Sequence, residues 1–347
     1  MGNSTNRPAG CSMMPDTYWL ATDAIFVLTY HVLAPLNFVF GLGGHLMFTV
    51  VCVRENKKEG AYAYQLLLTA SEILQLITGG MYNLITALYV LAGAERKGAA
   101  AEWISSQYFI MWYYATLSPT LMSIFVNLCL LFSACMALDR LLALARPYKY
   151  KSYNHKLYQV LAFCASLTFS VLSNIIDCFR KTAGSAGPGR YRVVNSAQSI
   201  RNDVVDTFHQ LRNFLPGVCL VVLVVCSALI VYLYRVRTTK VTAMTGANAA
   251  KEATRKDKEK TLLILTAFQS FFNFVAVTFS VAYRLLFYFM PSFTVCGSYL
   301  MVPIQHCVYL ITYGFDFYIM LLTSKRFRTL LKQHLHWKQK LKTRSQG

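Results

Sequence analysis

Seven stretches of the chain consist almost entirely of apolar residues, and polar stretches separate them. Each apolar stretch reaches about 20 residues, the length that crosses the hydrocarbon core of a bilayer as a helix. The pattern therefore predicts an all-α membrane protein, a seven-transmembrane helix bundle. The apolar stretches are residues 24–53, 62–92, 107–138, 157–178, 211–234, 261–290 and 298–322.

The chain after the last apolar stretch predicts a short amphipathic eighth helix. From Ser324 to Lys342, apolar residues recur near helical spacing with Lys and Arg between them. This pattern is typical of a helix that lies in the lipid headgroups. The chain then divides into an extracellular N-terminal segment 1–23, a seven-transmembrane domain 24–322, and the amphipathic helix with a cytoplasmic tail, 323–347.

The charged residues predict how the chain is oriented in the membrane. They make up 14% of the sequence, against about 25% in soluble domains. Most Lys and Arg fall in the loops on the side of Arg54, and basic loops favour the cytoplasm. The N-terminus, with a glycosylation sequon at Asn3, is then extracellular. Contact with anionic membrane lipids explains the net charge of +19, so nucleic-acid binding is not expected.

The pair Asp139-Arg140 ends the third apolar stretch, and Pro147 follows it. Charges are costly at the centre of a membrane helix, so an adjacent acid and base belong at its end. The segment resembles the Asp-Arg-Tyr sequence that closes the third transmembrane helix of rhodopsin-like (class A) G-protein-coupled receptors, with Leu141 in place of the Tyr. Pro147 and Tyr150 match the proline and the aromatic residue that follow in the family.

Positions in four other helices add to the resemblance. Glu72 stands for the Asp of the second helix, Pro216 matches the proline of the fifth, and Phe272 replaces the Trp of the sixth. Asp316 stands at the Asn/Asp-Pro-x-x-Tyr motif of the seventh helix, where Phe317 replaces the proline. The pattern, this last replacement above all, looks like that of divergent invertebrate neuropeptide-type receptors.

The resemblance implies a plasma-membrane, multi-pass receptor that activates a heterotrimeric G protein on binding an extracellular ligand, with a neuropeptide as the first expectation. Asp139 would hold Arg140 in the resting state, and outward movement of the sixth helix would free Arg140 to meet a helix of the G protein. The competing interpretation of Arg140 is an anchor at the membrane interface. The residues assigned to coupling and the switch are Asp139, Arg140, Tyr148, Pro216, Phe272 and Asp316.

Two acids lie deep within apolar stretches. Glu72 and Asp316 are neighbours by motif register in the family, and two carboxylates in a low-dielectric interior cannot both stay ionised without a cation. We therefore expect them to share a sodium ion or a proton. The alternative is that each acid has separate hydrogen-bond partners. No other metal site is predicted.

Register within the family also gives eight candidates for the ligand pocket. Met122 stands where amine receptors carry an Asp, so a biogenic amine is disfavoured. Arg212 could pair with an acidic or amidated peptide terminus. For each candidate, plain packing is the competing interpretation. The eight are Gln75, Tyr82, Met122, Arg212, Phe272, Gln305, His306 and Tyr309.

The loop 179–210 predicts a short strand or hairpin that covers the ligand site. Residues alternate between polar and apolar after the turn Gly187-Pro188-Gly189, as they do in strands. The sequence holds no metal-spaced His/Cys cluster, no phosphate-binding glycine loop and no nucleophile elbow. Neither an enzyme nor a cofactor is therefore predicted.

Two alternative functions stay open at this point. Within the same class, the ligand could be a small molecule or a lipid, which truncated peptide analogues would distinguish from a peptide. Outside the class, a seven-span transporter would move a solute across proteoliposomes without a G protein.

Overall fold

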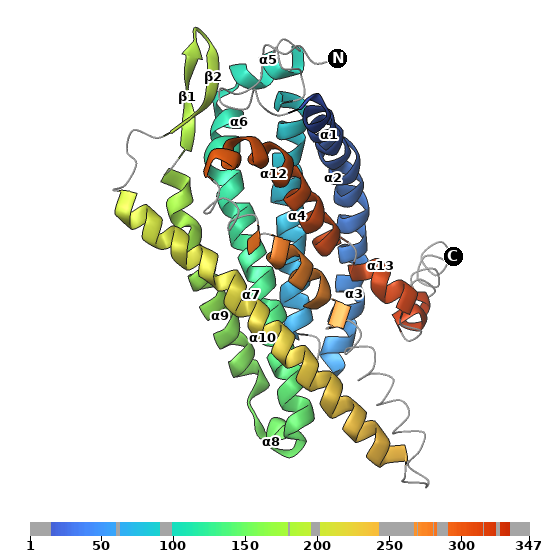
Figure 1. The fold of residues 1–347 in the computed structure, drawn as a ribbon. Coiled ribbons are helices and arrows are strands. Elements are labelled where there is room, and N and C mark those ends of the chain that lie inside the picture. Colours follow the sequence, from blue (N-terminus) through green and yellow to red (C-terminus); the bar gives the residue numbers. More distant parts are fainter. Residues whose placement is uncertain are drawn as a thin grey trace, which may run out of the picture.

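The computed structural model consists mainly of long helices, with a two-stranded hairpin at one end (Figure 1). We call this the hairpin end, and we call the opposite end, where α8 lies, the α8 end. The structure describes residues 15–59, 63–90, 99–179, 181–195, 202–242, 267–268, 270–279, 281–282, 291–314, 316–323 and 327–333.

The first helix runs without a break through three α-helical segments, α1 (Asp16–Val27), α2 (Ala34–Leu36) and α3 (Leu42–Glu59). Two π-helical turns join them, Leu28–Leu33 and Asn37–Gly41. Pro35 lies between the two turns, and a proline cannot donate the backbone bond that a regular helix needs. The helix begins at Asp16, so part of segment 1–23 is helical rather than an irregular tail.

The remaining helices and strands follow in chain order. They are α4 (Ala63–Val90), α5 (Ala99–Ser106), α6 (Tyr108–Trp112), the π turn Tyr113–Leu117, α7 (Ser118–Ala145), α8 (Pro147–Ser152), α9 (His155–Asn174), the 3-10 turn Ile175–Phe179, β1 (Lys181–Gly187), β2 (Arg190–Asn195), α10 (Asn202–Thr242), the helix Ser270–Phe279, α12 (Pro291–Gly314) and α13 (Asp316–Thr323).

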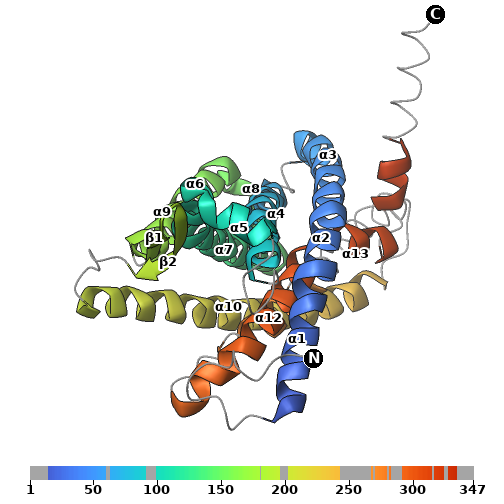
Figure 2. The ribbon, with the colours of Figure 1, turned by 90° about the horizontal axis from the view of Figure 1, so that it is seen from above.

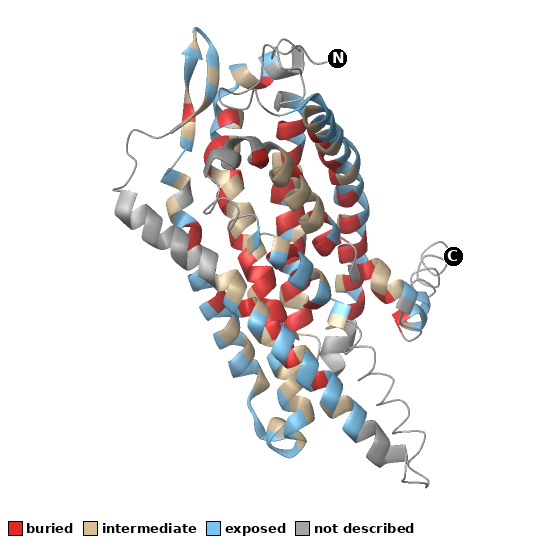
Figure 3. Ribbon diagram, viewed as in Figure 1, coloured by how far each residue is buried: buried red, intermediate tan, exposed pale blue. Residues whose placement is uncertain are grey.

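Helix α9 has the burial pattern of a helix in a membrane. Its buried side chains are all polar, Ser166, Ser170, Ser173 and Asn174, whereas Leu161 and Leu172 are exposed. A helix on the surface of a soluble protein shows the opposite pattern. Small and polar residues between helices with apolar residues outside are typical of membrane helices. Figure 3 shows the same exposed outer face on α9 and on much of α10.

Four helices within the described ranges are long and apolar enough to cross a membrane, Asp16–Val53, Tyr108–Ala145, His155–Asn174 and Leu215–Val236. The prediction of a mainly helical chain with several apolar helices of membrane-spanning length is therefore confirmed, with the hairpin as an addition to it. The finer prediction of seven spans stays a prediction.

Helix α7 lies at the centre and packs against α4, α9 and α10 (Figure 2). Leu128 and Phe132 of α7 form a buried cluster with Leu68 of α4 and Tyr313 of α12. Helix α7 thus packs against three of the long helices and runs between the two ends of the molecule.

The hairpin predicted for loop 179–210 is confirmed. Strands β1 and β2 pair antiparallel, and Gly189 in the turn has a φ of 67°, which glycine adopts without strain. Ala183 of β1 is buried in a cluster with Ile104 of α5 and Met111 of α6. The hairpin is thereby fixed to the helices at this end.

The start of the predicted amphipathic tail packs onto the first helix. The ring of Phe327 lies 5.5 Å from that of Phe48 and 5.8 Å from that of Phe317. Arg328 donates hydrogen bonds from Nη1 to the carbonyls of Leu321 and Leu322, at 3.1 and 2.7 Å. These carbonyls lie at the end of α13, where a helix leaves its carbonyls without backbone partners. Residues 334–347 lie outside the described part of the chain.

Helices α12 and α2–α3 approach closely at Gly314. A Cβ atom there would collide with the side-chain amide of Asn37, whereas Gly43 in α3 has open space around it. Overpacking costs about 1–3 kcal/mol. We expect Gly314→Ala to lower the melting temperature of the purified protein in nanodiscs, and Gly43→Ala to leave it unchanged or raise it. Equal effects of the two substitutions would contradict the close approach.

Candidate functional site

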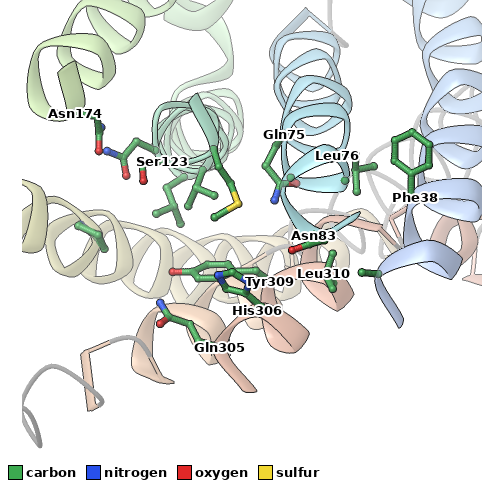
Figure 4. A pocket seen from close by; sticks show the side chains of 18 residues that line it. Phe38, Gln75, Leu76, Asn83, Ser123, Asn174, Gln305, His306, Tyr309 and Leu310 are labelled. Carbon is green, nitrogen blue, oxygen red and sulfur yellow. The ribbon is translucent and has the colours of Figure 1, made fainter. Parts of the chain in front are cut away.

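A cavity of about 160 Å³ lies within the helices (Figure 4). Its walls come from α4, α7 and α12, with single residues from α2, α9 and α10 and Phe38 from a π turn. An engineered cavity of about 150 Å³ binds benzene. The space therefore suits one ring-sized group, such as a small molecule or a single side chain of a larger ligand.

The cavity brings together five of the eight predicted ligand contacts, Gln75, Met122, Gln305, His306 and Tyr309. Pro216, predicted as a switch residue, also lines it. Tyr82 and Phe272 are described but are not among the lining residues. The side chain of Arg212 lies outside the described residues, so its predicted role stays a prediction.

An aromatic layer lies beside the cavity and includes Tyr82. Its ring stacks on Tyr114 at 5.0 Å and meets His306 edge-on at 5.9 Å. The hydroxyl of Tyr30 lies 2.9 Å from Nδ1 of His306. His306 of α12 is thus held against the first helix by Tyr30, and its ring lines the cavity. Tyr82 thus contacts a residue of the cavity wall but is not itself part of the wall.

Phe272 lies in a separate aromatic row on the helix Ser270–Phe279. Its ring stacks near Phe268 and meets Phe271 edge-on at 5.6 Å. Polar contacts hold this helix to its neighbours. Ser227 of α10 donates to Ser270 at 2.8 Å, and Asn273 donates to Ser133 of α7 at 3.3 Å.

Sequence reasoning missed three asparagines in the cavity wall, Asn83, Asn127 and Asn174. They come from α4, α7 and α9. A carboxamide is costly in a membrane interior without a partner, so Asn within an apolar stretch is the signal that could have found them. None of the lining residues that the structure describes is Asp, Glu, Lys or Arg.

A second polar cluster lies at the α8 end, where α7 stops. Nη2 of Arg140 lies 3.6 Å from Oδ2 of Asp139, and their side chains are 17% and 12% exposed. The hydroxyl of Tyr150 donates to both carboxylate oxygens of Asp139, at 3.0 and 3.1 Å. Burial raises the pKa of the Tyr150 hydroxyl, and the negative charge of Asp139 raises it further. Tyr150 therefore keeps its proton and acts as a hydrogen-bond donor to Asp139.

The local sequence explains how Tyr150 reaches Asp139. Arg146 leaves the helical conformation with φ −137° and ψ 66°, because the residue before a proline is disfavoured in a helix. Pro147 then begins α8 at a position where its missing N–H is no loss. One turn later Tyr150 faces back toward α7, whereas Tyr148 is 89% exposed. An exposed Tyr148 fits its predicted place on a docking surface.

Glu72 of α4 is buried, and its partner is His45 of α3. Nδ1 of His45 lies 3.4 Å from Oε2 of Glu72. Nε2 of His45 lies 2.5 Å from the carbonyl oxygen of Tyr313. A carbonyl oxygen only accepts, so Nε2 carries a proton. The imidazole and the carboxyl thus face each other as a buried acid–base pair.

The predicted Glu72–Asp316 site is therefore untested. Asp316 begins α13, but its side chain lies outside the described residues, and the shared sodium ion or proton stays a prediction. Sequence reasoning missed His45 as the contact of Glu72. The two residues are adjacent only because α3 and α4 pack together, which no local motif indicates.

Comparison with known proteins gives no family assignment. No protein-family model matches the chain, and no curated protein sequence matches it. The likeness to class A receptors therefore rests on the residues described above, and it supports a proposal rather than an identity.

We expect His45→Leu to destabilise the protein strongly. It would leave the buried Glu72 carboxyl without its imidazole, and breaking a buried ion pair costs about 3–5 kcal/mol. The melting temperature in nanodiscs measures the loss. His31, an exposed histidine of the first helix, provides the matched control in His31→Leu.

The double variant His45→Leu/Glu72→Gln should recover much of the lost stability, because it also replaces the buried carboxyl of Glu72 with an uncharged amide. A double variant no more stable than His45→Leu alone would contradict the pairing.

Proposed function

We propose that the chain is a rhodopsin-like receptor that activates a heterotrimeric G protein when an extracellular ligand, a neuropeptide in the first instance, binds in the cavity. One observation carries this proposal. Helix α7 supplies both the cavity wall, from Met122 onward, and the Asp139–Arg140 cluster. At 1.5 Å per residue, Met122 and Arg140 lie about 27 Å apart along the helix, and the last wall residue, Leu130, lies about 14 Å from Asp139. Such an arrangement suits a device that transmits binding at one end to contacts at the other.

In this proposal the chain crosses the membrane seven times. The four spans described above are joined by α4, by the segment around the helix Ser270–Phe279, and by α12. Helices α4 and α12 have 28 and 24 residues, which is long enough for a bilayer crossing. The basic loops favour an orientation with the α8 end in the cytoplasm and the hairpin end outside the cell, and the N-terminus is proposed to be extracellular. The plasma membrane is the expected location.

The switch depends on which contacts Arg140 makes. In the resting state Asp139 holds Arg140, and Tyr150 fixes the position of Asp139. The Ser227–Ser270 and Asn273–Ser133 hydrogen bonds keep the helix Ser270–Phe279 against α10 and α7. When ligand binding favours a packing in which these bonds are broken, the helix moves outward. A groove then opens in which Arg140 can meet a helix of the G protein.

The size of the cavity favours the in-class alternative as much as the first proposal. A space of about 160 Å³ holds a small molecule whole, whereas a peptide would insert one side chain or one terminus. Both ligands would act through the same switch.

The direct test is a peptide-library screen with a promiscuous G-protein reporter, run on the wild type and on Arg140→Ala. We expect ligand-stimulated nucleotide exchange in the wild type and its loss in Arg140→Ala, because the guanidinium is the proposed contact with the G protein. Arg146→Ala is the matched control, since Arg146 is exposed just beyond α7, and it should keep the response. Solute flux through proteoliposomes without a G protein would instead support a transporter.

We expect Tyr150→Phe to raise nucleotide exchange in the absence of ligand. The substitution removes the hydroxyl that donates to Asp139, and hydrogen bonds to charged groups contribute about 1.5–3 kcal/mol. If about half of this free energy stabilises the resting state over the active one, exchange should rise by up to about tenfold. Tyr153→Phe, on the same loop, provides the control. Unchanged basal exchange in Tyr150→Phe would show that Tyr150 has no part in the switch.

A further inference from the structure

The cavity wall contains buried polar atoms that have no hydrogen-bond partner. They are Oε1 of Gln75, Oδ1 of Asn83, Nδ2 of Asn127 and Oδ1 of Asn174. All four residues line the cavity, and none is more than 5% exposed. An unpaired buried polar atom costs about 1–3 kcal/mol. Four such atoms around one space therefore mark hydrogen bonds that water or a ligand in the cavity would have to supply.

The orientation of Asn174 is fixed by its other contacts. Its Nδ2 donates to the carbonyl of Ser170 at 2.8 Å and to the hydroxyl of Ser173 at 3.1 Å. A carbonyl oxygen cannot donate, so the amide cannot be reversed. Oδ1 of Asn174 is consequently an acceptor that requires a donor from the occupant.

The other unpaired amide atoms include both acceptors and a donor, so an occupant would need donors and an acceptor to pair with them. Gln75 and Asn83 come from α4, and Figure 4 shows them across the cavity from Asn174 and Ser123. As placed, Gln75 and Asn83 present acceptors, whereas Asn127 presents a donor. A carboxamide carries two N–H donors and one carbonyl acceptor in a single plane, so it can serve the Asn127 donor and two of the three unpaired acceptors.

The wall also favours an uncharged group, because its histidine, His306, already contacts the hydroxyl of Tyr30 through Nδ1. No Asp, Glu, Lys or Arg is found among the lining residues in the described ranges. An ionised group without a counter-charge loses several kcal/mol when it leaves water for such an interior. Apolar lining from Leu76, Met122 and Val126 suits a ring or a short hydrocarbon attached to the amide.

We propose that the cavity binds an uncharged carboxamide group on a ring-sized apolar body. This inference rests on the proposed function for its signalling role, and it names the ligand chemistry of that site. Such a group occurs both in free small amides and at the amidated C-terminus of a peptide. The shared chemistry is the same, and the experiment separates the two sources.

The test measures binding to the purified full chain in nanodiscs by thermal shift, with benzamide, benzoate and benzylammonium at equal millimolar concentrations. The three probes share one ring and differ in charge. Benzamide should raise the melting temperature, with an apparent affinity at least about tenfold above that of either charged probe. Equal binding of a charged probe, or no binding of benzamide at millimolar concentration, would overturn the proposal.

A charge swap in the wall makes the test specific to the site. Asn83→Asp keeps the side-chain shape and installs an anion, so preference should shift by about tenfold or more from benzamide toward benzylammonium. Gln65→Glu is the matched control, because Gln65 is another buried amide of α4 that is not among the lining residues. A shift as large in Gln65→Glu as in Asn83→Asp would contradict binding in this cavity.

Two further probes distinguish the sources. Acetyl-phenylalanine amide, compared with acetyl-phenylalanine, imitates an amidated peptide terminus and its free acid. Tighter binding of the peptide amide than of benzamide supports a peptide source, and the reverse supports a small amide. The thermal-shift test contains no G protein, so it reports on the amide site alone. Benzamide binding together with a peptide-library screen in which no ligand stimulates exchange would count against the receptor function and leave the amide site standing.

Discussion

The structure depends on the requirement that a polar group within a membrane finds its partner inside the protein. Hydrocarbon offers no hydrogen bonds, so a buried polar side chain needs a partner on its own helix or on a neighbouring one. The contact between His45 and Glu72 joins α3 to α4. The hydrogen bond from Asn273 to Ser133 joins the helix Ser270–Phe279 to α7. The serines of α9 lie on its inner face while its leucines lie outside. Apolar faces gain little by leaving lipid for another helix, so the polar contacts specify which helices lie side by side.

The two proposed sites are the places where this requirement is met in unusual ways. In the cavity, amides of α4, α7 and α9 are left for an occupant to satisfy. At the α8 end, Asp139 has partners within the protein on both sides, the neighbouring Arg140 and the hydroxyl of Tyr150. One site is incomplete without a ligand, and the other is closed until a contact is broken. Helix α7 connects them, which gives the proposed receptor a physical route from binding to coupling.

The sequence predicted what depends on neighbouring residues and missed what depends on packing. Apolar stretch length, the end of α7 near Pro147 and the hairpin at Gly187-Pro188-Gly189 are local properties, and the structure agrees with them. The start of the first helix at Asp16 was missed because its first turns are mixed in polarity. His45 as the contact of Glu72, and the asparagines of the cavity wall, depend on which helix faces which. Of the residues chosen by register within a resembling family, Gln75 and His306 line the cavity whereas Phe272 does not, and ligand contact stays a prediction for all three.

The central claim is that Asp139 restrains Arg140 and that release of Arg140 permits coupling. The most direct measurement is ligand-free nucleotide exchange on a purified G protein in nanodiscs with Asp139→Asn, which removes the charge but keeps an acceptor for Tyr150. Ligand-free exchange should exceed the wild-type level in Asp139→Asn. It should return to the wild-type level or below in Asp139→Asn/Arg140→Ala. Exchange that is the same in all three proteins would contradict the claim.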